Sequence, residues 1–380
     1  MRALAPVRRA VPLRRGCGTE GNAQLKMLLG VEQVSLFQSG TQALQAVLAH
    51  CATNQSALRN EVILPAYGCP DLVTACLGAG LTPRFADILA NGWGYCQSSL
   101  QSTLGPATLA VVAVDLLGLG DESPRLRSLI HDPDIALVQD SAQHLPRHPA
   151  PWSSDYQVFS FGRGKPLNLL GGGAATGVEQ AQPEINAVSR RNLMQSRAGA
   201  LLFNVATNPW LYGLASRLPG LGIGSTRYRL PQQLRAPSPG LAQQLAVALP
   251  NWRRYASYSV MAWQPYLTAW EALGIQVLRT SYCDTTPTEP LRLGLSAAST
   301  QLRDQLVAAL CRAGLGASRL YGSALPQIDG VPSQLRSQGT YPAAEALATR
   351  LFTLPTHTGL TAREAEKADR IVRHIAGSIR

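Results

Sequence analysis

The sequence predicts an α/β protein: a mainly parallel sheet with helices on both faces, followed by a smaller C-terminal α/β domain. Between about residues 30 and 178, short β-branched apolar runs alternate with segments in which apolar residues recur every three or four positions. This strand–helix–strand repetition is typical of parallel sheets. Because 46% of the 380 residues are hydrophobic and only 15% are charged, the chain can bury a sizeable core, which excludes a disordered protein.

The expected elements of the first part follow one another in a regular order. Six runs have the character of strands, and three segments between them have helical spacing. In the first helical segment, Leu44, Val47 and Leu48 form one apolar stripe. The strands are expected at 34–37, 62–64, 83–86, 109–115, 135–140 and 157–161, and the helices at 40–52, 70–78 and 124–130.

The second part of the chain is less regular. Prolines and glycines interrupt residues 183–250, so we expect a long, loop-rich connection in which a helical pattern resumes only at Leu241. A long amphipathic helix is expected over 252–273, and the last hundred residues read as a small α/β unit. Its final helix has a capping box, Thr361 to Glu364, at its start. These patterns divide the chain into an N-terminal arm (1–30), a large domain (31–250) and a small domain (251–380).

Composition and charge argue against two classes of function, nucleic-acid binding and membrane insertion. The net charge is +11, but the basic residues, almost all arginine, are single or paired, without the run of five to eight that marks a nucleic-acid patch. This favours solvated surface charge, with a pocket for an anionic substrate as the alternative. No apolar run approaches the roughly 18 residues of a membrane helix. We therefore expect neither a nucleic-acid nor a membrane partner.

The cysteines argue against a disulfide framework and against a zinc site. There are seven, an odd number, and no two of them form a Cys-x-x-Cys pair. We therefore expect no bound metal and a reducing, cytoplasmic location.

Three groups of residues at predicted strand ends contain the candidate catalytic and ligand-binding residues. The first is Ser39-Gly40-Thr41, between a strand and a helix. A glycine here lets a ligand approach the backbone, and the helix N-terminus offers free N–H groups to a phosphate. The alternative is that Ser39 or Thr41 only caps the helix.

The second group is Asp140 to Gln143, after an apolar strand. A carboxylate at the mouth of a buried strand is costly unless a cation or a good donor pairs with it. The protonated ring nitrogen of a cofactor would be such a partner. The alternative is that Asp140 caps the next helix.

The third group is the segment from Ser160 to Lys165, followed by a run of three glycines. A phosphate-binding P-loop is excluded, because Pro166 stands where Ser or Thr is required and Phe159 where the first glycine is required. A lone lysine among glycines remains, and a lysine partly removed from water can form a Schiff base. The alternative is an ordinary surface lysine.

Together the three groups are what a pyridoxal-phosphate site needs. The phosphate, the ring nitrogen and the aldehyde of the cofactor would each receive one partner, in that chain order on a parallel sheet. The order and spacing resemble the DegT/StrS-type family of sugar aminotransferases, of the aspartate aminotransferase-like fold type I. The segments that carry the resemblance are 39–44 (SGTxAL in the family), 61–67 (EVIxPxY/F), 85–88 (FVDI), 115–121 (HLYGxxAD), 140–143 (DAAQ), 160–165 (SFxxxK) and 354–361 (LPxHxxLT).

The resemblance implies a role for each matched residue. Lys165 would carry the cofactor and Asp140 would pair with its ring nitrogen, both as catalytic residues. The other cofactor-binding residues would be Gly40, Thr41, Tyr67, Cys69, Gln143, Ser160 and Arg229, the last supplied by the partner subunit of a homodimer.

Three positions depart from the family, and at one of them, Leu116 or a near neighbour, the histidine of HLYG is missing. Cys69 stands where an aromatic residue or His usually stacks on the cofactor ring, and a small packing residue is the favoured reading over a redox or nucleophilic one. Arg227-Tyr228-Arg229 replaces the family's Asn-Tyr-Arg, so that Arg227 either binds the cofactor phosphate or faces a diphosphate on the substrate.

The resemblance implies an aminotransferase that moves an amino group from glutamate or glutamine to a keto sugar, nucleotide-linked, in surface polysaccharide or amino-sugar biosynthesis. Two alternatives stay open. One is a pyridoxal-phosphate dehydratase, although such enzymes of the family usually have His in place of the lysine at 165. The other is a catalytically impaired cofactor-binding protein with a regulatory or assembly role.

Overall fold

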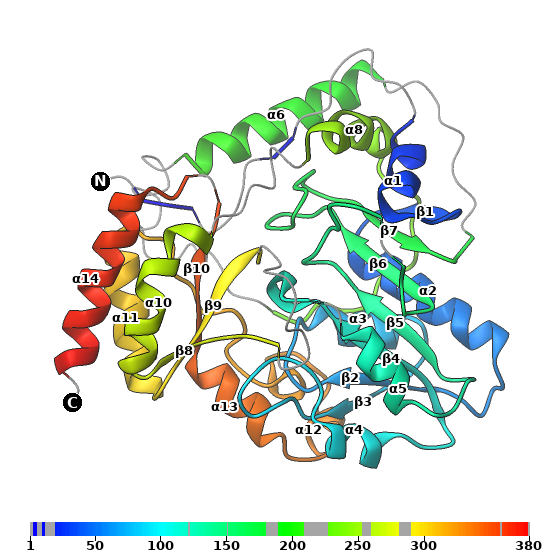
Figure 1. Cartoon of the computed structure of the whole chain (residues 1–380). Helices are drawn as coiled ribbons and strands as arrows, with labels where there is room; N and C mark the ends of the chain where they lie inside the picture. Colours follow the sequence, from blue (N-terminus) through cyan, green and yellow to red (C-terminus); the bar gives the residue numbers. More distant parts are fainter. Residues whose placement is uncertain are drawn as a thin grey trace.

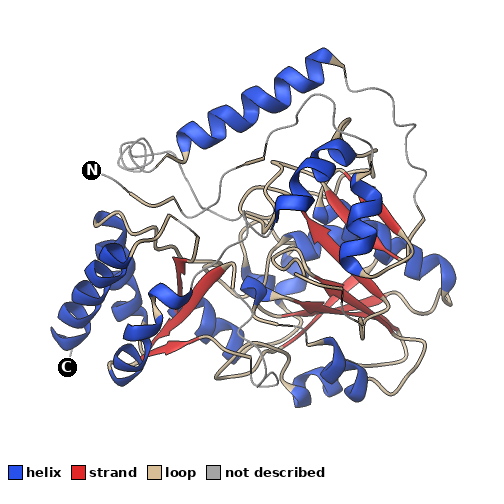
Figure 2. Cartoon of the chain, turned by 45° about the horizontal axis from the view of Figure 1, so that its top comes forward, coloured by secondary structure: helices blue, strands red, loops and turns tan. Residues whose placement is uncertain are grey.

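The computed structural model describes residues 3–5, 10–11, 20–120, 122–149, 151–179, 189–208, 227–252, 260–280, 290–357 and 359–378. A seven-stranded sheet with its helices forms one side of the molecule, and a three-stranded sheet with its own helices forms the other (Figures 1 and 2). This is the predicted α/β class. None of the helices in the described ranges is long and apolar enough to cross a bilayer.

The large sheet is mainly parallel, as predicted. Its order is β1-β7-β6-β5-β4-β2-β3. The five strands from β6 to β3 run parallel, whereas β7 pairs antiparallel with both β1 and β6. The strands are β1 (Val34–Phe37), β2 (Glu61–Pro65), β3 (Thr82–Ala86), β4 (Thr108–Val114), β5 (Ala136–Asp140), β6 (Tyr156–Ser160) and β7 (Gly173–Thr176).

Both faces of this sheet are buried, which explains why its strands are apolar without interruption. In β4, Val112 packs on the same face as α2 and α3, while Val111 packs on the opposite face with α4 and α5. A third cluster joins the β1–β7 edge to α1 and α8. The helices are α1 (Gly21–Leu29), α2 (Gly40–Asn54), α3 (Asp71–Gly78), α4 (Gln97–Thr103), α5 (Ser123–Leu129), α6 (Arg190–Ala206) and α8 (Leu241–Ala248).

The prediction of a loop-rich connection over 183–250 was wrong for residues 190–206. These residues form α6, a 17-residue helix that Ser189 caps by accepting a hydrogen bond from the N–H of Asn192. The prolines that suggested a loop all lie outside the helix, at Pro183 before it and from Pro209 onward. The resumption of helix at Leu241 is confirmed.

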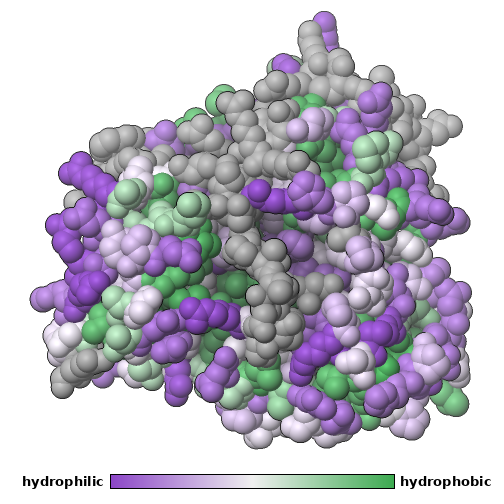
Figure 3. Space-filling model, in the orientation of Figure 1, coloured by the Kyte–Doolittle hydropathy of each residue, from purple (hydrophilic) through white to green (hydrophobic). Residues whose placement is uncertain are grey.

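The second sheet is antiparallel, in the order β10-β9-β8. It confirms the predicted small α/β unit. On one side lie α10, α11 and α14, whose outer face is the hydrophilic left edge of the molecule in Figure 3. The elements are β8 (Ile275–Val277), β9 (Arg292–Ala297), β10 (Leu351–Pro355), α10 (Gln264–Ala272), α11 (Thr300–Arg312), α12 (Ser333–Arg336), α13 (Pro342–Arg350) and α14 (Ala362–Ser378).

Two expectations about helix starts have different outcomes. The capping box of α14 is confirmed, because the N–H of Thr361 donates to the Glu364 carboxylate at 2.9 Å and the N–H of Glu364 donates to Thr361 Oγ1 at 3.3 Å. The helix expected over 252–273 is observed only at its end, as α10, which begins at Gln264 with Pro265 in its first turn. Residues 253–259 of that expected helix lie outside the described part.

Hydrogen bonds between residues far apart in the sequence join the two sheets with their helices. Asp87, just after β3, accepts hydrogen bonds from the backbone N–H groups of Ala343 and Ala344 at 3.0 and 2.9 Å. These groups open α13, so one carboxylate of the large sheet caps a helix of the C-terminal part. The division into an arm, a large domain and a small domain with a boundary at residue 250 stays a prediction.

Candidate active site

A cavity of about 550 Å³, counted with its open mouth, lies where β5 and β6 end and α2 begins. In an open parallel sheet this is where ligands bind, because loops at the carboxyl ends of the strands leave a crevice there. About half of the residues that line the cavity are site residues predicted from the sequence. These are Gly40, Thr41, Cys69, Asp140, Gln143, Ser160 and Lys165.

The N-terminus of α2 forms one wall, as predicted. Ser39 caps the helix, since its Oγ accepts a hydrogen bond from the N–H of Gln42 at 3.2 Å. Capping and phosphate binding are therefore compatible, because the cap leaves other N–H groups of the first turn available. A side chain at Gly40 would bring its Cβ within 2.7 Å of Ser160 Cβ, so only glycine fits between α2 and β6.

Asp140 lies at the end of β5, beside the cavity. Its Oδ1 accepts a hydrogen bond from the N–H of Ala142 at 2.9 Å, and the residues that follow form a turn, so it does not cap a helix. Burial raises the pKa of this carboxyl to about 6, while the nearby charge of Lys165 acts in the opposite direction. Such a carboxylate favours a cationic ligand, because a positive charge would relieve the cost of its burial.

A polar network behind β5 holds Asp140 in place. The buried carboxylate of Asp115 accepts from Gln139 Nε2 at 3.1 Å and from Ser141 Oγ at 2.6 Å, the two residues that flank Asp140. On its other side, Gln139 accepts from Ser123 and Ser154 at 3.3 and 3.1 Å.

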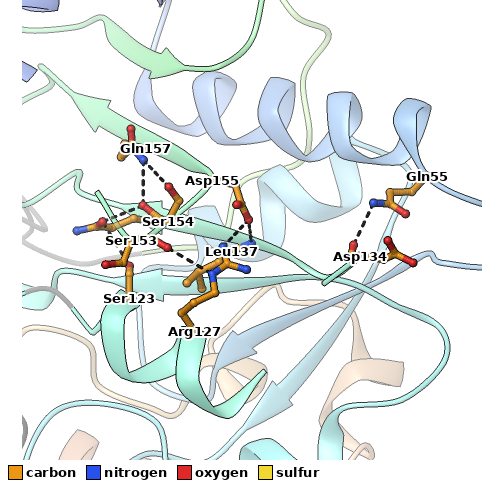
Figure 4. A network of polar contacts seen from close by, with 10 residues as sticks. Gln55, Ser123, Arg127, Asp134, Leu137, Ser153, Ser154, Asp155 and Gln157 are labelled. Atoms are coloured by element: carbon orange, nitrogen blue, oxygen red, sulfur yellow. Dashed lines mark hydrogen bonds and ion pairs between the residues drawn. The ribbon is translucent and has the colours of Figure 1, made fainter. Parts of the chain in front are cut away.

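The network continues to the start of β5, where Asp155 accepts from the N–H of Leu137 and from Arg127, both at 2.7 Å (Figure 4). A strand anchored on both sides in this way keeps a carboxylate at a fixed position.

Lys165 follows β6 and lines the cavity. Its N–H donates to the carbonyl of Gly162 at 3.3 Å, which closes a tight turn. Gly164 within that turn has a φ of +73°, a left-handed conformation that favours glycine. The glycines around Lys165 thus shape the turn that brings the lysine to the cavity.

Gln143 connects the cavity to the C-terminal part of the chain. Its Oε1 accepts from the N–H of Leu117 at 2.9 Å, and its Nε2 donates to the Tyr321 hydroxyl at 3.3 Å. Both bonds fix the orientation of the amide. Tyr321 was not predicted from sequence, since it lies 178 residues after Gln143 and no local pattern marks it.

Tyr67 supports the wall from behind and does not line the cavity. Its hydroxyl donates to the carbonyl of Tyr321 and accepts from the N–H of the same residue, both at 3.2 Å. The two rings pack edge to face, with their centroids 5.5 Å apart. The structure thus brings Tyr67 to the site as a support for Tyr321, and its direct contact with a cofactor stays a prediction.

Cys69 is a neutral thiol at the cavity wall. Burial raises its pKa to about 12, and the Asp71 carboxylate acts in the same direction. A thiol, unlike a thiolate, is a poor nucleophile, so this environment supports packing over reactivity. Among the described cysteines, Cys51, Cys69, Cys76, Cys96 and Cys311 are all free; Cys17 and Cys283 lie outside the described residues.

Arg227 and Arg229 are exposed and do not line the cavity of their own chain. The carbonyl of Arg229 accepts a hydrogen bond from Thr74 Oγ1 at 2.8 Å, which places this segment beside α3. Its role in a neighbouring subunit stays a prediction. Asp121, the last residue of one segment matched to the family, lies outside the described residues. In the described ranges, no three His, Cys, Asp or Glu side chains are grouped to hold a metal ion.

Comparison with known proteins identifies the region that contains this cavity. The model of the DegT/DnrJ/EryC1/StrS aminotransferase family matches residues 20–200. Residues 20–200 are therefore similar to this aminotransferase family. The resemblance that the sequence motifs suggested is thereby confirmed for the part of the chain that holds Gly40, Asp140 and Lys165.

Two curated relatives match part of this chain. One is a UDP-N-acetyl-3-dehydro-alpha-D-glucosamine 3-aminotransferase of Acidithiobacillus ferrooxidans, 26% identical over 182 residues, which are 46% of this chain and 48% of the relative. The other is an L-glutamine:2-deoxy-scyllo-inosose aminotransferase of Streptomyces kanamyceticus, 28% identical over 141 residues, which are 36% of this chain and 32% of the relative. The matches thus span about half or less of each relative's length.

Comparison with solved structures shows a similar fold over nearly the whole chain. Helicobacter pylori PseC, an aminotransferase involved in the biosynthesis of pseudoaminic acid, superimposes with a TM-score of 0.67 at 17% identity. The superposition covers 99% of this chain and 100% of PseC. The predicted fold type, including the smaller C-terminal α/β part, is therefore confirmed.

Proposed function

We propose that this chain is a pyridoxal-phosphate-dependent aminotransferase that moves an amino group from glutamate or glutamine to a keto sugar. The observation that supports this most directly is the convergence of a helix N-terminus, Asp140 and Lys165 on one cavity. Each of these three is weak evidence alone, but together they offer one partner to each reactive part of the cofactor. The aminotransferase-family region that contains them adds to the argument.

The residues present fit pyridoxal phosphate. The first turn of α2, with Thr41 and Ser160, would bind the phosphate, since Gly40 lets the start of α2 lie directly against Ser160. Asp140, a partly desolvated carboxylate, suits the ring nitrogen. Gln143, whose amide is already oriented, suits the ring hydroxyl.

Pyridoxal phosphate, when bound, supplies an electron-accepting ring next to the carbon that exchanges its proton. Asp140 Oδ holds a proton on the ring nitrogen, because a carboxylate so placed stabilises the charged form of its partner. Lys165 Nζ would hold the cofactor, and the same amine would take and return a proton as general base and acid. Cys69, a neutral thiol, packs at the wall and moves no proton.

The acceptor that we propose is a keto sugar linked to a nucleotide, in amino-sugar or surface polysaccharide biosynthesis. One relative acts on a UDP-linked dehydro-glucosamine, and the name of the other includes L-glutamine. Arg227 would suit the diphosphate of such an acceptor, since the planar guanidinium binds phosphate oxygens in pairs.

The functional unit that we propose is a cytoplasmic homodimer. Arg229 is exposed and does not line the cavity of its own chain, as expected for a side chain that completes the phosphate site of a neighbouring subunit. The free state of the five described cysteines is compatible with a reducing compartment.

The first test is the absorbance spectrum of the purified protein with pyridoxal phosphate, recorded before and after glutamate or glutamine is added. We expect a bound-cofactor band that shifts with the amino donor and is lost in Lys165→Ala, together with turnover. If glutamate and glutamine both leave the band unchanged, either the amino donor is a different one or turnover is lost. If Lys165→Ala turns over normally, the assignment of the lysine is wrong.

A further inference from the structure

The outward face of α6 carries an exposed apolar strip. Met194, Leu201 and Val205 are 69%, 64% and 45% exposed, and Ala198 lies between them. These positions are four, three and four residues apart, so at 3.6 residues per turn they line one side of the helix. Figures 1 and 2 both draw α6 at the outer edge of the molecule, above the two sheets.

The opposite face of α6 fixes the helix to the rest of the chain. Leu193 and Ala200 are buried on that face. Asn204 accepts from the N–H of Ala10 at 2.7 Å and donates to its carbonyl at 3.0 Å, and Gln244 of α8 donates to Ser196 at 2.9 Å. The apolar strip therefore faces outward because the other side of the helix is occupied.

Arginines border the apolar strip on both sides. At 100° per residue, Arg190 and Arg197 project along one edge of the strip and Arg191 along the other, and all three are exposed. The helix has no acidic residue. This arrangement is typical of helices that lie in a membrane interface, with apolar side chains inserted and arginines reaching the headgroups.

The positive charge is concentrated in the part of the sequence that contains this helix. Residues 185–270 contain nine arginines and neither Asp nor Glu, so they carry +9 of the net charge of +11. The rest of the chain is almost balanced. The basic residues form no consecutive run, which is why sequence analysis favoured dispersed surface charge, but over 86 residues they form one cationic region.

We propose that α6 docks this protein on the surface of an anionic lipid bilayer, with Met194, Leu201 and Val205 in the headgroup region and the arginines on lipid phosphates. A second copy of this chain is a poorer occupant, because its α6 has the same positive charge and no acidic side chain to pair with these arginines. A bilayer rich in anionic lipid is complementary to both the charge and the apolar strip. The inference does not depend on the proposed aminotransferase activity.

The test is co-sedimentation of the full chain with vesicles of phosphatidylcholine alone or with one third phosphatidylglycerol, at low and high salt. Since each arginine near an anionic surface strengthens binding roughly fivefold, we expect binding at least about tenfold tighter to the anionic vesicles. High salt should weaken it. The double variants Met194→Gln/Leu201→Gln and Arg190→Gln/Arg191→Gln should each lose about tenfold or more.

Met27→Gln/Leu58→Gln is the matched control, since these side chains are 76% and 82% exposed on other parts of the surface. It should bind vesicles as the wild type does, and circular dichroism should verify the fold of all variants. The proposal is overturned if the wild type does not prefer anionic vesicles or if the α6 variants bind them normally. It is also overturned if the Met194/Leu201 variant changes only the oligomeric state in sedimentation velocity, because α6 is then a contact between copies.

Discussion

At the scale of single residues, Asp140 has to satisfy opposing demands of stability and function. The pKa of its carboxyl is about 6 in the folded chain and about 3.8 when exposed, so the folded state holds the proton more strongly. The free energy of unfolding of the cofactor-free protein therefore falls as the pH rises from about 4 to 6. This difference between the two pKa values corresponds to a loss of about 3 kcal/mol.

Asp140→Asn should remove this loss. Its cofactor-free form should unfold with a free energy about 3 kcal/mol higher than that of the wild type at pH 7.5, but within about 1 kcal/mol of it at pH 4. Urea denaturation at the two pH values measures both differences. The same variant should transfer amino groups more slowly. An equal gain at both pH values would show that packing, and not the charge of Asp140, is the cause.

The residues of the site differ in how far the sequence could predict them. Lys165 and Asp140 could be predicted because each follows a recognisable apolar strand, and strand ends meet at one edge of a parallel sheet. Tyr321 could not, because its contact with Gln143 depends on how the C-terminal part docks. The local sequence of Cys69 does not reveal its state either, since its raised pKa results from tertiary burial.

At the scale of elements, β7, one of the two shortest strands of the large sheet, fixes the position of the α2 wall of the cavity. β7 places Gly173 against the backbone between β1 and α2, where an added Cβ would come within 2.5 Å of the carbonyl carbon and oxygen of Ser39. A backbone atom cannot move aside as a side-chain tip can. The close approach of β7 therefore sets where α2 begins.

Gly173→Ala should destabilise the protein by about 2 kcal/mol or more and weaken cofactor binding, because α2 must shift to make room. Gly171→Ala is the matched control: it is two residues away, and its Cβ would have no neighbour within 4 Å. We expect the control to stay within about 0.5 kcal/mol of the wild type. Thermal unfolding and pyridoxal-phosphate titration measure the two effects, and equal behaviour of both variants would contradict the steric argument.

The sequence predicted elements well where periodicity was strong. The strand at 34–37 agrees with β1 at both ends, and the other five predicted strands agree within a residue or so. β7 could not be found, because Gly-Ala-Ala-Thr has little β propensity and becomes a strand only through its pairing with β1 and β6. The sequence analysis did not predict α6 because prolines lie on both sides of it, although the helix itself contains none.

At the scale of the whole molecule, the proposed dimer makes a quantitative prediction. If Arg229 completes the site of the neighbouring subunit, Lys165→Ala and Arg229→Ala inactivate different halves of each site. Each variant alone should be inactive or nearly so. Unfolding and refolding them together should restore about a quarter of wild-type activity, since half of the dimers are mixed and each mixed dimer has one intact site.

The control is Lys165→Ala refolded with Asp140→Asn, whose changes fall in the same half of the site. That mixture should gain nothing. If the Lys165→Ala and Arg229→Ala mixture also gains nothing while sedimentation shows mixed dimers, Arg229 does not act across the interface.

Contacts with the end of the chain also set the order in which a newly made chain can mature. Tyr321, which bonds Gln143, and the N–H groups of residues 343 and 344, which bond Asp87, all belong to the last sixty residues. Domains generally fold from the N-terminus during synthesis. The seven strands of the large sheet can thus assemble on the ribosome while the Gln143 amide still lacks its Tyr321 partner. We expect pyridoxal phosphate to be captured firmly only after release, when Tyr321 fixes that amide.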